Sequence, residues 1–148
     1  MSFNILNETM LKFGAPETCI RTYSTWLVLL RPAQVTLGAL VLVAREPVTA
    51  FSQLSPAGFT ELAQVARDID TVLSHLFRYD KLNYLMLMMV DPHVHFHVIP
   101  RYAEKRAYGG LEFSDAAWPG PPDLGHINQV DDKVFNQLRD ELRALWPA

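Results

Sequence analysis

The sequence has little that would mark an exported or membrane-spanning protein. Its 148 residues include one cysteine, Cys19, so no disulfide can form within the chain. The longest stretch without a charged side chain, residues 47–60, has 14 residues and includes polar ones, so it is too short and too polar for a transmembrane helix. Residues 1–14 include Glu8 and Lys12 and lack the apolar run of a secretion signal. We therefore expect a cytoplasmic protein that does not engage a membrane.

The chain also lacks an excess of basic residues. Its 13 lysines and arginines are outnumbered by 16 aspartates and glutamates, which gives a formal net charge of −3. A surface for long nucleic acid needs clustered positive charge, so long nucleic acid is excluded as a partner. The remaining composition, with 49% hydrophobic residues, is typical of a globular chain. The length suits a single domain that spans residues 1–148.

Hydrophobic periodicity predicts a mixture of helices and strands. Helical spacing is clearest over residues 56–78, where Ser55 is a suitable N-cap and Pro56 a suitable first helical residue. A shorter helix is predicted over residues 4–13, and a C-terminal helix over residues 131–146.

Between these helices, aromatic and β-branched runs predict strands. The predicted strands cover residues 20–23, 26–30, 39–43, 82–90 and 94–99. The last two are predicted to form a hairpin with a tight connection at Asp91 and Pro92. Glycine and proline are frequent in residues 103–130, which predicts a long irregular loop there.

Three of the five histidines occupy alternate positions, His93, His95 and His97. In an extended strand alternate side chains share a face, so the three imidazoles are predicted to lie together while Val94 and Phe96 point into the core. The Cα atoms of neighbouring histidines in such a row are roughly 7 Å apart, twice the rise per residue, which is about the span of a phosphate group. Imidazoles are costly to bury unless each finds a partner, so stability alone gives little reason for such a row. The row therefore indicates a functional site.

Two kinds of site fit this row. One is a metal site, because neutral imidazole is a common zinc ligand, with further ligands from Cys19, His75 or His126. None of those three stands at a spacing that brings a second ligand with it. The other is a phosphoryl site, in which one neutral histidine attacks phosphorus while a protonated neighbour stabilises charge. The residues by themselves leave both possibilities open.

The segment HVHFHVIPR, residues 93–101, resembles the signature of the histidine triad (HIT) family of nucleotidyl hydrolases and transferases. The likeness extends upstream through residues 38–43, 45–48 and 51–56, and covers about residues 20–102 in all. It implies an α+β fold, with an antiparallel sheet of about five strands packed on one long helix, and a homodimer. It also implies a small nucleotide substrate, such as a diadenosine polyphosphate or a nucleoside phosphoramidate, and neither a cofactor nor a protein-bound metal.

The resemblance also implies roles for the three histidines. His95 matches the family's nucleophile, which attacks an α-phosphate and forms a covalent nucleotidyl-histidine that water then hydrolyses. His93 and His97 match the flanking histidines, which contact the phosphate and orient the nucleophile.

Four further residues are candidates for substrate binding. Asn83 precedes the triad on the adjacent predicted strand, Arg31 and Arg101 can supply positive charge to a polyphosphate, and Trp118 can stack on a base or cover the site. Each also has a plain structural explanation: a hydrogen bond at a sheet edge for Asn83, a solvated surface position for the arginines, and a loop anchor for Trp118.

The sequence departs from the family pattern in three places. Many members have Gly-His where this chain has Gly38-Ala39, and a polar residue where it has Met89. A ribose-binding asparagine or aspartate is expected near the strand that ends at Leu30, but Arg31 follows instead. The alternatives to a hydrolase are therefore a nucleotide-binding protein with little turnover and a metal-dependent enzyme built on the histidine row.

Overall fold

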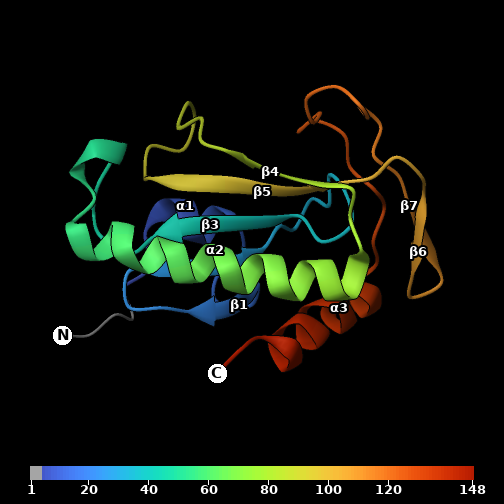
Figure 1. The fold of residues 1–148 in the computed structure, drawn as a ribbon, viewed down its shortest axis with the longest axis horizontal. Coiled ribbons are helices and arrows are strands. Elements are labelled where there is room, and N and C mark those ends of the chain that lie inside the picture. The colour runs from blue at the N-terminus through green and yellow to red at the C-terminus, as the bar shows by residue number, and fades with distance from the viewer. Residues whose placement is uncertain (1–4) are drawn as a thin grey trace.

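A five-stranded antiparallel sheet forms the centre of the structure, a computed structural model that describes residues 5–148 (Figure 1). The strand order is β1-β2-β3-β5-β4. The strands are β1 (Cys19–Thr22), β2 (Trp26–Leu30), β3 (Leu40–Ala44), β4 (Lys81–Leu85) and β5 (His95–Arg101). The predicted α+β fold with five strands is thus confirmed.

The long helix α2 (Pro56–Phe77) crosses one face of this sheet, and α3 (Asp132–Leu145) lies beside it (Figure 1). The Ser55 hydroxyl caps α2 by accepting a hydrogen bond from the Gly58 amide at 3.0 Å, and the Asp131 carboxylate caps α3 in the same way. Both helices match their predicted spans to within one residue at each end. None of the helices within residues 5–148 is long and apolar enough to cross a membrane.

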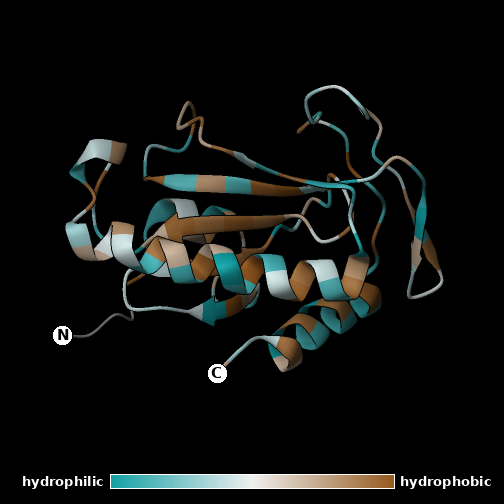
Figure 2. Cartoon of the chain, viewed as in Figure 1, coloured by the Kyte–Doolittle hydropathy of each residue, from teal (hydrophilic) through white to brown (hydrophobic). Residues whose placement is uncertain are grey.

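The opposite face of the sheet is covered by a short helix, α1 (Glu8–Lys12). It begins after Asn7, whose side chain accepts a hydrogen bond from the Met10 amide at 2.9 Å. It is therefore shorter than the helix predicted over residues 4–13. Residue 4 lies outside the described residues. With both faces covered, all five residues of β3 are buried, and Figure 2 shows this strand as hydrophobic throughout. The core on this side contains Met10, Phe13, Ala15, Leu27, Leu29, Val41 and Val43.

The two strands predicted as a hairpin do pair antiparallel, as β4 and β5, but the predicted tight connection between them is wrong. Strand β4 ends at Leu85 and β5 begins at His95, so residues 86–94 form a nine-residue connection. Met88 has a positive φ of 45° and Pro92 has no backbone N–H, and both features oppose a continued strand. The apolar pattern that predicted a strand over residues 86–90 belongs instead to a segment that borders a cavity. His93 consequently lies in this connection and not on a strand.

Residues 103–130 are also more regular than predicted. A two-stranded sheet pairs β6 (Arg106–Tyr108) with β7 (Leu111–Phe113). Gly109 and Gly110, both with positive φ, form the two-residue turn between them, which is the backbone geometry that favours glycine in a hairpin. The rest of the segment is irregular, as expected.

Candidate active site

His95 and His97 project from β5 on the face of the sheet that α1 covers. Their ring centroids are 5.1 Å apart, and they lie 6.2 Å and 5.9 Å from the ring of Phe13. His95 is 2% exposed and His97 is 7% exposed. Two imidazoles are therefore held side by side in a largely desolvated place, which is costly without a function for them.

The orientation of His95 is fixed by its own strand. Its Nδ1 lies 2.6 Å from the backbone carbonyl oxygen of His93. Because a carbonyl oxygen only accepts, Nδ1 carries the proton and donates it. In the neutral ring the lone pair is then on Nε2, which is the tautomer of a nucleophile.

His97 is held in its neutral form. Burial lowers the pKa of His97 to about 4, with smaller contributions from His95 and the positive charge of Arg31. Its Nδ1 is enclosed and has no hydrogen-bond partner among residues 5–148. The site thus contains a second imidazole with an unused polar atom.

His93 is separated from the other two imidazoles. Its Nδ1 lies 3.0 Å from the hydroxyl of Thr9 on α1, and its side chain borders a neighbouring hollow of about 680 Å³. The prediction that all three rings share one row is therefore wrong, because the chain enters β5 only at His95. His93 contributes to the site through its carbonyl group, which orients His95.

His95 and His97 open into a cavity of about 230 Å³, which we call the triad cavity. One wall comes from α1, where Lys12 forms an ion pair of 2.9 Å with Asp91. The connection before β5 supplies another wall. The lining residues are Lys12, Phe13, Arg31, Leu87, Met88, Met89, Val90, Asp91, His95, His97 and Leu124.

Arg31 also lines this cavity, directly after the end of β2. It is 9% exposed and its guanidinium lies over the ring of Phe13, 5.9 Å from the centroid. Nη1 donates to the carbonyl of Ala33 at 2.7 Å, but the buried Nε has no partner among the described residues. Burial lowers the pKa of Arg31, which reflects the cost of keeping this charge away from water.

The loop that presents Arg31 is tied down by two buried amide side chains. Gln34 donates to the carbonyls of Arg31 and Ala39 and accepts from the amide of Gly38. Asn128 donates to the carbonyl of Gln34 at 3.0 Å and so joins this loop to the segment before α3. Arg31 is therefore fixed by the fold and does not lie on a free surface.

The other three predicted binding residues lie elsewhere. Arg101, at the far end of β5, makes two hydrogen bonds to the carboxylate of Asp115 and a third, of 2.8 Å, to Asn83 Oδ1. It also donates to the carbonyl of Gly120 at 2.8 Å. Asn83 and Arg101 thus hydrogen-bond each other. Trp118 belongs to the segment of residues 115–120, which Arg101 binds at both ends. None of the three lines the triad cavity. The side chains of Asn83 and Arg101 are engaged in holding this segment instead.

Comparison with known proteins agrees with this geometry. A family model described as the HIT domain matches residues 18–104, which is more than half of the chain. The chain belongs to the HIT family. Members of this family are generally nucleotide hydrolases or transferases, and the fold is of the type that binds nucleotides. No curated protein matches the sequence.

Several solved structures share the HIT fold. A histidine triad protein from Bradyrhizobium japonicum superposes with a TM-score of 0.75 at 21% identity, over 96% of this chain and 97% of that one. A hypothetical histidine triad nucleotide-binding protein from Sulfolobus tokodaii gives 0.66 at 15% identity, over 93% and 88%. A zinc-bound histidine triad family protein from Mycobacterium smegmatis gives 0.62 at 17% identity, also over 93% and 88%. At these identities the likeness shows a common fold.

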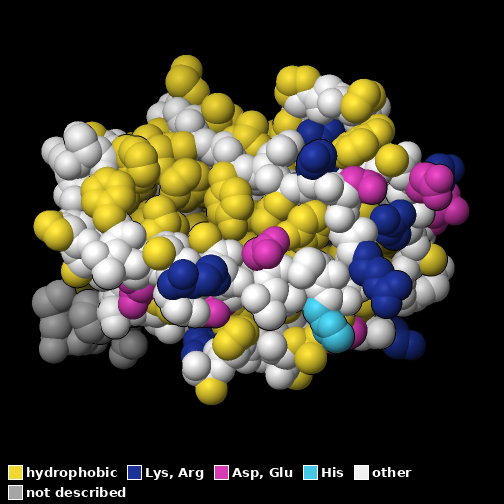
Figure 3. All heavy atoms as spheres, in the orientation of Figure 1, with side chains coloured by type: hydrophobic (Ala, Val, Ile, Leu, Met, Phe, Trp, Pro, Cys, Tyr) yellow, Lys and Arg dark blue, Asp and Glu magenta, His cyan; other side chains and the backbone are white. Residues whose placement is uncertain are grey.

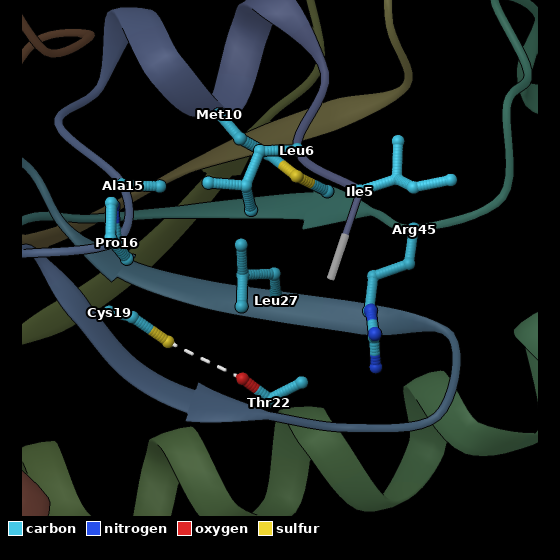
Figure 4. Close-up of a pocket in the computed structure, with 9 residues that line it drawn as sticks. All are labelled: Ile5, Leu6, Met10, Ala15, Pro16, Cys19, Thr22, Leu27 and Arg45. Atoms are coloured by element: carbon cyan, nitrogen blue, oxygen red, sulfur yellow. Dashed lines mark hydrogen bonds between the residues drawn. The ribbon is translucent and has the colours of Figure 1, made fainter. Parts of the chain in front are cut away.

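The residues considered as additional metal ligands are not brought to the triad. Cys19 lies on β1 beside a different, mainly apolar cavity of about 360 Å³ and contacts Thr22 at 3.5 Å (Figure 4). His75 is exposed on α2, and His126 lies in the segment before α3. Within residues 5–148, no three histidine, cysteine or acidic side chains are arranged to hold a metal ion.

Sequence reasoning missed the part of the HIT site that α1 contributes. Thr9, Lys12 and Phe13 reach His93, Asp91 and the rings of His95 and His97, all of which lie more than 75 positions further along the chain. The helical spacing of Phe13 was visible, but nothing local shows which face of the sheet a short helix covers.

Proposed function

We propose that this chain is a nucleotidyl hydrolase that cleaves a phosphoanhydride or phosphoramidate at an α-phosphate, with His95 as the nucleophile. A diadenosine polyphosphate is the representative substrate. The observation that carries the proposal is the hydrogen bond from His95 Nδ1 to the His93 carbonyl, because it leaves Nε2 unprotonated beside a cavity.

The proposed reaction has two displacements. First, the lone pair of His95 Nε2 attacks the α-phosphorus, a P–N bond forms, and the bond to the leaving oxygen or nitrogen breaks as that group takes a proton from solvent water. Water then attacks the same phosphorus, the P–N bond breaks, and nucleoside monophosphate leaves while a proton is released to solvent. The carbonyl of His93 stabilises the positive ring of the intermediate, because it accepts from Nδ1 throughout.

His97 has a supporting role in this proposal. Its buried neutral ring stacks edge-on against His95, and its free nitrogen can hydrogen-bond a phosphate oxygen that enters the cavity. Arrival of that anion raises the pKa of His97 from its low resting value, so the ring gains charge only when substrate is bound.

Intact-mass spectrometry tests the nucleophile directly. Wild-type protein is mixed with diadenosine triphosphate or adenosine 5′-phosphoramidate and quenched early, and the mass of an adenylyl group is expected on the protein. His95→Asn should lose both the adduct and hydrolysis, with a rate lowered by about 10³-fold or more. His75→Asn is the matched control, since this histidine is exposed on α2 and should react as the wild type does.

A folded His95→Asn protein that hydrolyses these compounds at close to the wild-type rate overturns the assignment. Adduct formation by His95→Asn would point to another nucleophile.

A nucleotide-binding protein with little turnover is the second candidate, and one observation favours it. Residues 87–90, which line the cavity, are all apolar, and Met89 is 86% exposed. No side chain there can protonate a leaving group. The same experiment separates the two functions, because tight binding of AMP without adduct or hydrolysis supports the second.

We also propose that the protein is a homodimer that pairs through the β4 edge. Beside this edge strand, Phe51 and Phe59 are each 41% exposed and Tyr84 is 38% exposed. The rings of Phe51 and Tyr84 each lie 6.0 Å from the ring of Phe96, and the ring of Phe59 lies 5.2 Å from that of Phe51. Figure 3 shows a continuous area of hydrophobic side chains on this face of the molecule. An unpaired strand edge next to such a patch favours association with a second copy.

Light scattering at micromolar concentration tests this assembly. The expected mass is twice the chain mass of 16.8 kDa, and Phe59→Lys should lower it to that of one chain. Leu145→Lys, at an exposed apolar position on α3, is the control that should stay dimeric. A wild-type mass of one chain contradicts the proposal.

A further inference from the structure

Arg31 is a buried cation without an anion. It forms no ion pair with any described carboxylate, although it is 9% exposed and lines the triad cavity. The cation beside it, Lys12, differs in both respects, because it is paired with Asp91 and its side chain is 48% exposed. A desolvated guanidinium costs free energy, and the carbonyl of Ala33 and the ring of Phe13 offset only part of what an opposite charge would recover.

One edge of the Arg31 guanidinium is available for that charge. Nη1 is used by the carbonyl of Ala33, whereas Nε and Nη2 have no acceptor among residues 5–148. Nε and Nη2 form the edge with which arginine binds phosphates and carboxylates through two parallel hydrogen bonds. The unused atoms are therefore those that recognise a tetrahedral or planar anion.

The cavity also limits what can reach both residues. Its volume of about 230 Å³ is below the usual range for a site that encloses a whole small ligand, about 300–1,000 Å³. The groups that meet His95 and Arg31 must accordingly be small, as phosphates are, while the rest of the ligand extends outside.

We propose that the triad cavity binds two phosphates of one substrate, one at His95 and a second on the Nε and Nη2 edge of Arg31. This inference rests on the proposed function and specifies its substrate class, a nucleotide with at least two phosphates. The second phosphate comes either from the polyphosphate chain or from the sugar. Arg31 takes the place where the family resemblance predicts an acidic or amide partner for ribose hydroxyls, and a cation there favours an anionic group.

Calorimetry with four stable compounds tests the second phosphate and its source. The compounds are AMP, α,β-methylene-ADP, adenosine 2′,5′-bisphosphate and adenosine 3′,5′-bisphosphate. We expect at least one compound with a second phosphate to bind the wild-type protein about tenfold or more tightly than AMP, the gain typical of charge-assisted hydrogen bonds. Preference for α,β-methylene-ADP shows that the second phosphate comes from the polyphosphate chain, and preference for a bisphosphate shows that it comes from the sugar.

Variants then assign this preference to Arg31. Arg31→Gln should reduce the affinity ratio to AMP to within about threefold, and Arg31→Lys should give an intermediate ratio, because it keeps the charge but loses the paired donors. Lys12→Gln is the matched control, since it removes a cation from the same cavity wall and should weaken all four compounds alike. Thermal melting of each variant confirms that it is folded, and the Lys variant keeps the test available if the Gln variant is not.

The outcomes separate this inference from the proposed function. If His95 forms the nucleotidyl adduct but the three compounds with a second phosphate all bind within about threefold of AMP, the second-phosphate site is overturned and the proposed function stands. The same holds if the preference persists in Arg31→Gln. If no compound binds and no adduct forms, both proposals fall.

Discussion

The two ends of strand β5 hold their polar groups in opposite ways, although they lie on one face of one sheet. At the Arg101 end, the guanidinium is bound by Asp115, Asn83 and the carbonyl of Gly120, and the side chains of the Arg101–Asp115 ion pair are 4% and 2% exposed. At the His95 end, the buried atoms Arg31 Nε and His97 Nδ1 have no partner among the described residues.

The difference separates groups that stabilise the fold from groups reserved for a ligand. A buried polar atom that is hydrogen-bonded contributes modestly to stability, whereas an unsatisfied one costs about 1–3 kcal/mol. Unsatisfied atoms of two side chains in one cavity therefore indicate a site whose missing partner arrives from outside. Arginine content alone could not reveal this, because Arg31 and Arg101 are similarly buried.

The largest change in stability is expected at the Arg101 end of β5, where the buried polar groups are paired. Arg101→Met leaves the buried carboxylate of Asp115 without its partner, and removal of one member of a buried ion pair costs about 3–5 kcal/mol of unfolding free energy. Urea denaturation should show this loss as a lower midpoint. The double variant with Asp115→Leu should recover part of it, since no charge is then left unpaired. A loss below about 1 kcal/mol in the single variant would contradict the structural role of Arg101.

A smaller loss is expected at Asn128, which links the two ends. Its side chain donates to the carbonyls of Gln34, Val35 and Ser114 and accepts from the amide of Ser114. Asn128→Ala leaves these groups unsatisfied, so we expect a loss of about 2–3 kcal/mol, measured by the same denaturation.

The Asn128→Ala variant should also weaken AMP binding, because the loop that presents Arg31 loses a tether. Asn136→Ala, on α3, is the control. An equal loss of AMP affinity in both variants would contradict the role of the tether.

The third prediction concerns pH. His97 is protonated below pH 6.5 in the unfolded chain but only below about pH 4 in the folded one. Between these values the unfolded state binds more protons, so the free energy of unfolding falls as the pH drops from 6.5 toward 4. After allowance for solvent screening this histidine accounts for about 2 kcal/mol of the fall.

Comparison of variants isolates that contribution. Denaturation curves at a series of pH values should show a shallower decline for His97→Asn than for wild type, whereas His75→Asn should follow the wild type. Parallel curves for wild type and His97→Asn would mean that the buried ring does not titrate in this way.

Much of the fold was predictable because its signals are local. The cap at Ser55, the proline at the start of α2 and the single apolar helix face predicted that helix to within a residue. The β6–β7 hairpin was missed although Gly109-Gly110 is a standard turn pair, because the frequent prolines beyond it dominated the composition of the segment.

The site was predictable only in part, because an alternating pattern in the sequence does not show at which residue the strand begins. The pattern at His93, His95 and His97 correctly placed two rings together, but where β5 begins depends on pairing with β3, whose Val43 lies opposite His95. Likewise, nothing in the sequence distinguishes Arg31 from Arg101. The carboxylate that pairs with Arg101 comes from Asp115, which lies beyond its strand, whereas Arg31 bonds only the nearby backbone carbonyl of Ala33.

The smallest change in stability is expected at Arg31 itself. Arg31→Met keeps an unbranched side chain over the ring of Phe13 and loses one hydrogen bond, to Ala33, but it also removes a desolvated charge without a partner. These effects oppose each other, so the free energy of unfolding should be unchanged or raised by about 1 kcal/mol, while nucleotide affinity falls. Such a gain in stability at the expense of binding is typical of a residue kept for function. Denaturation of Arg31→Met and Arg101→Met side by side measures the contrast, and a loss at Arg31 of about 3 kcal/mol would show that both arginines hold the fold.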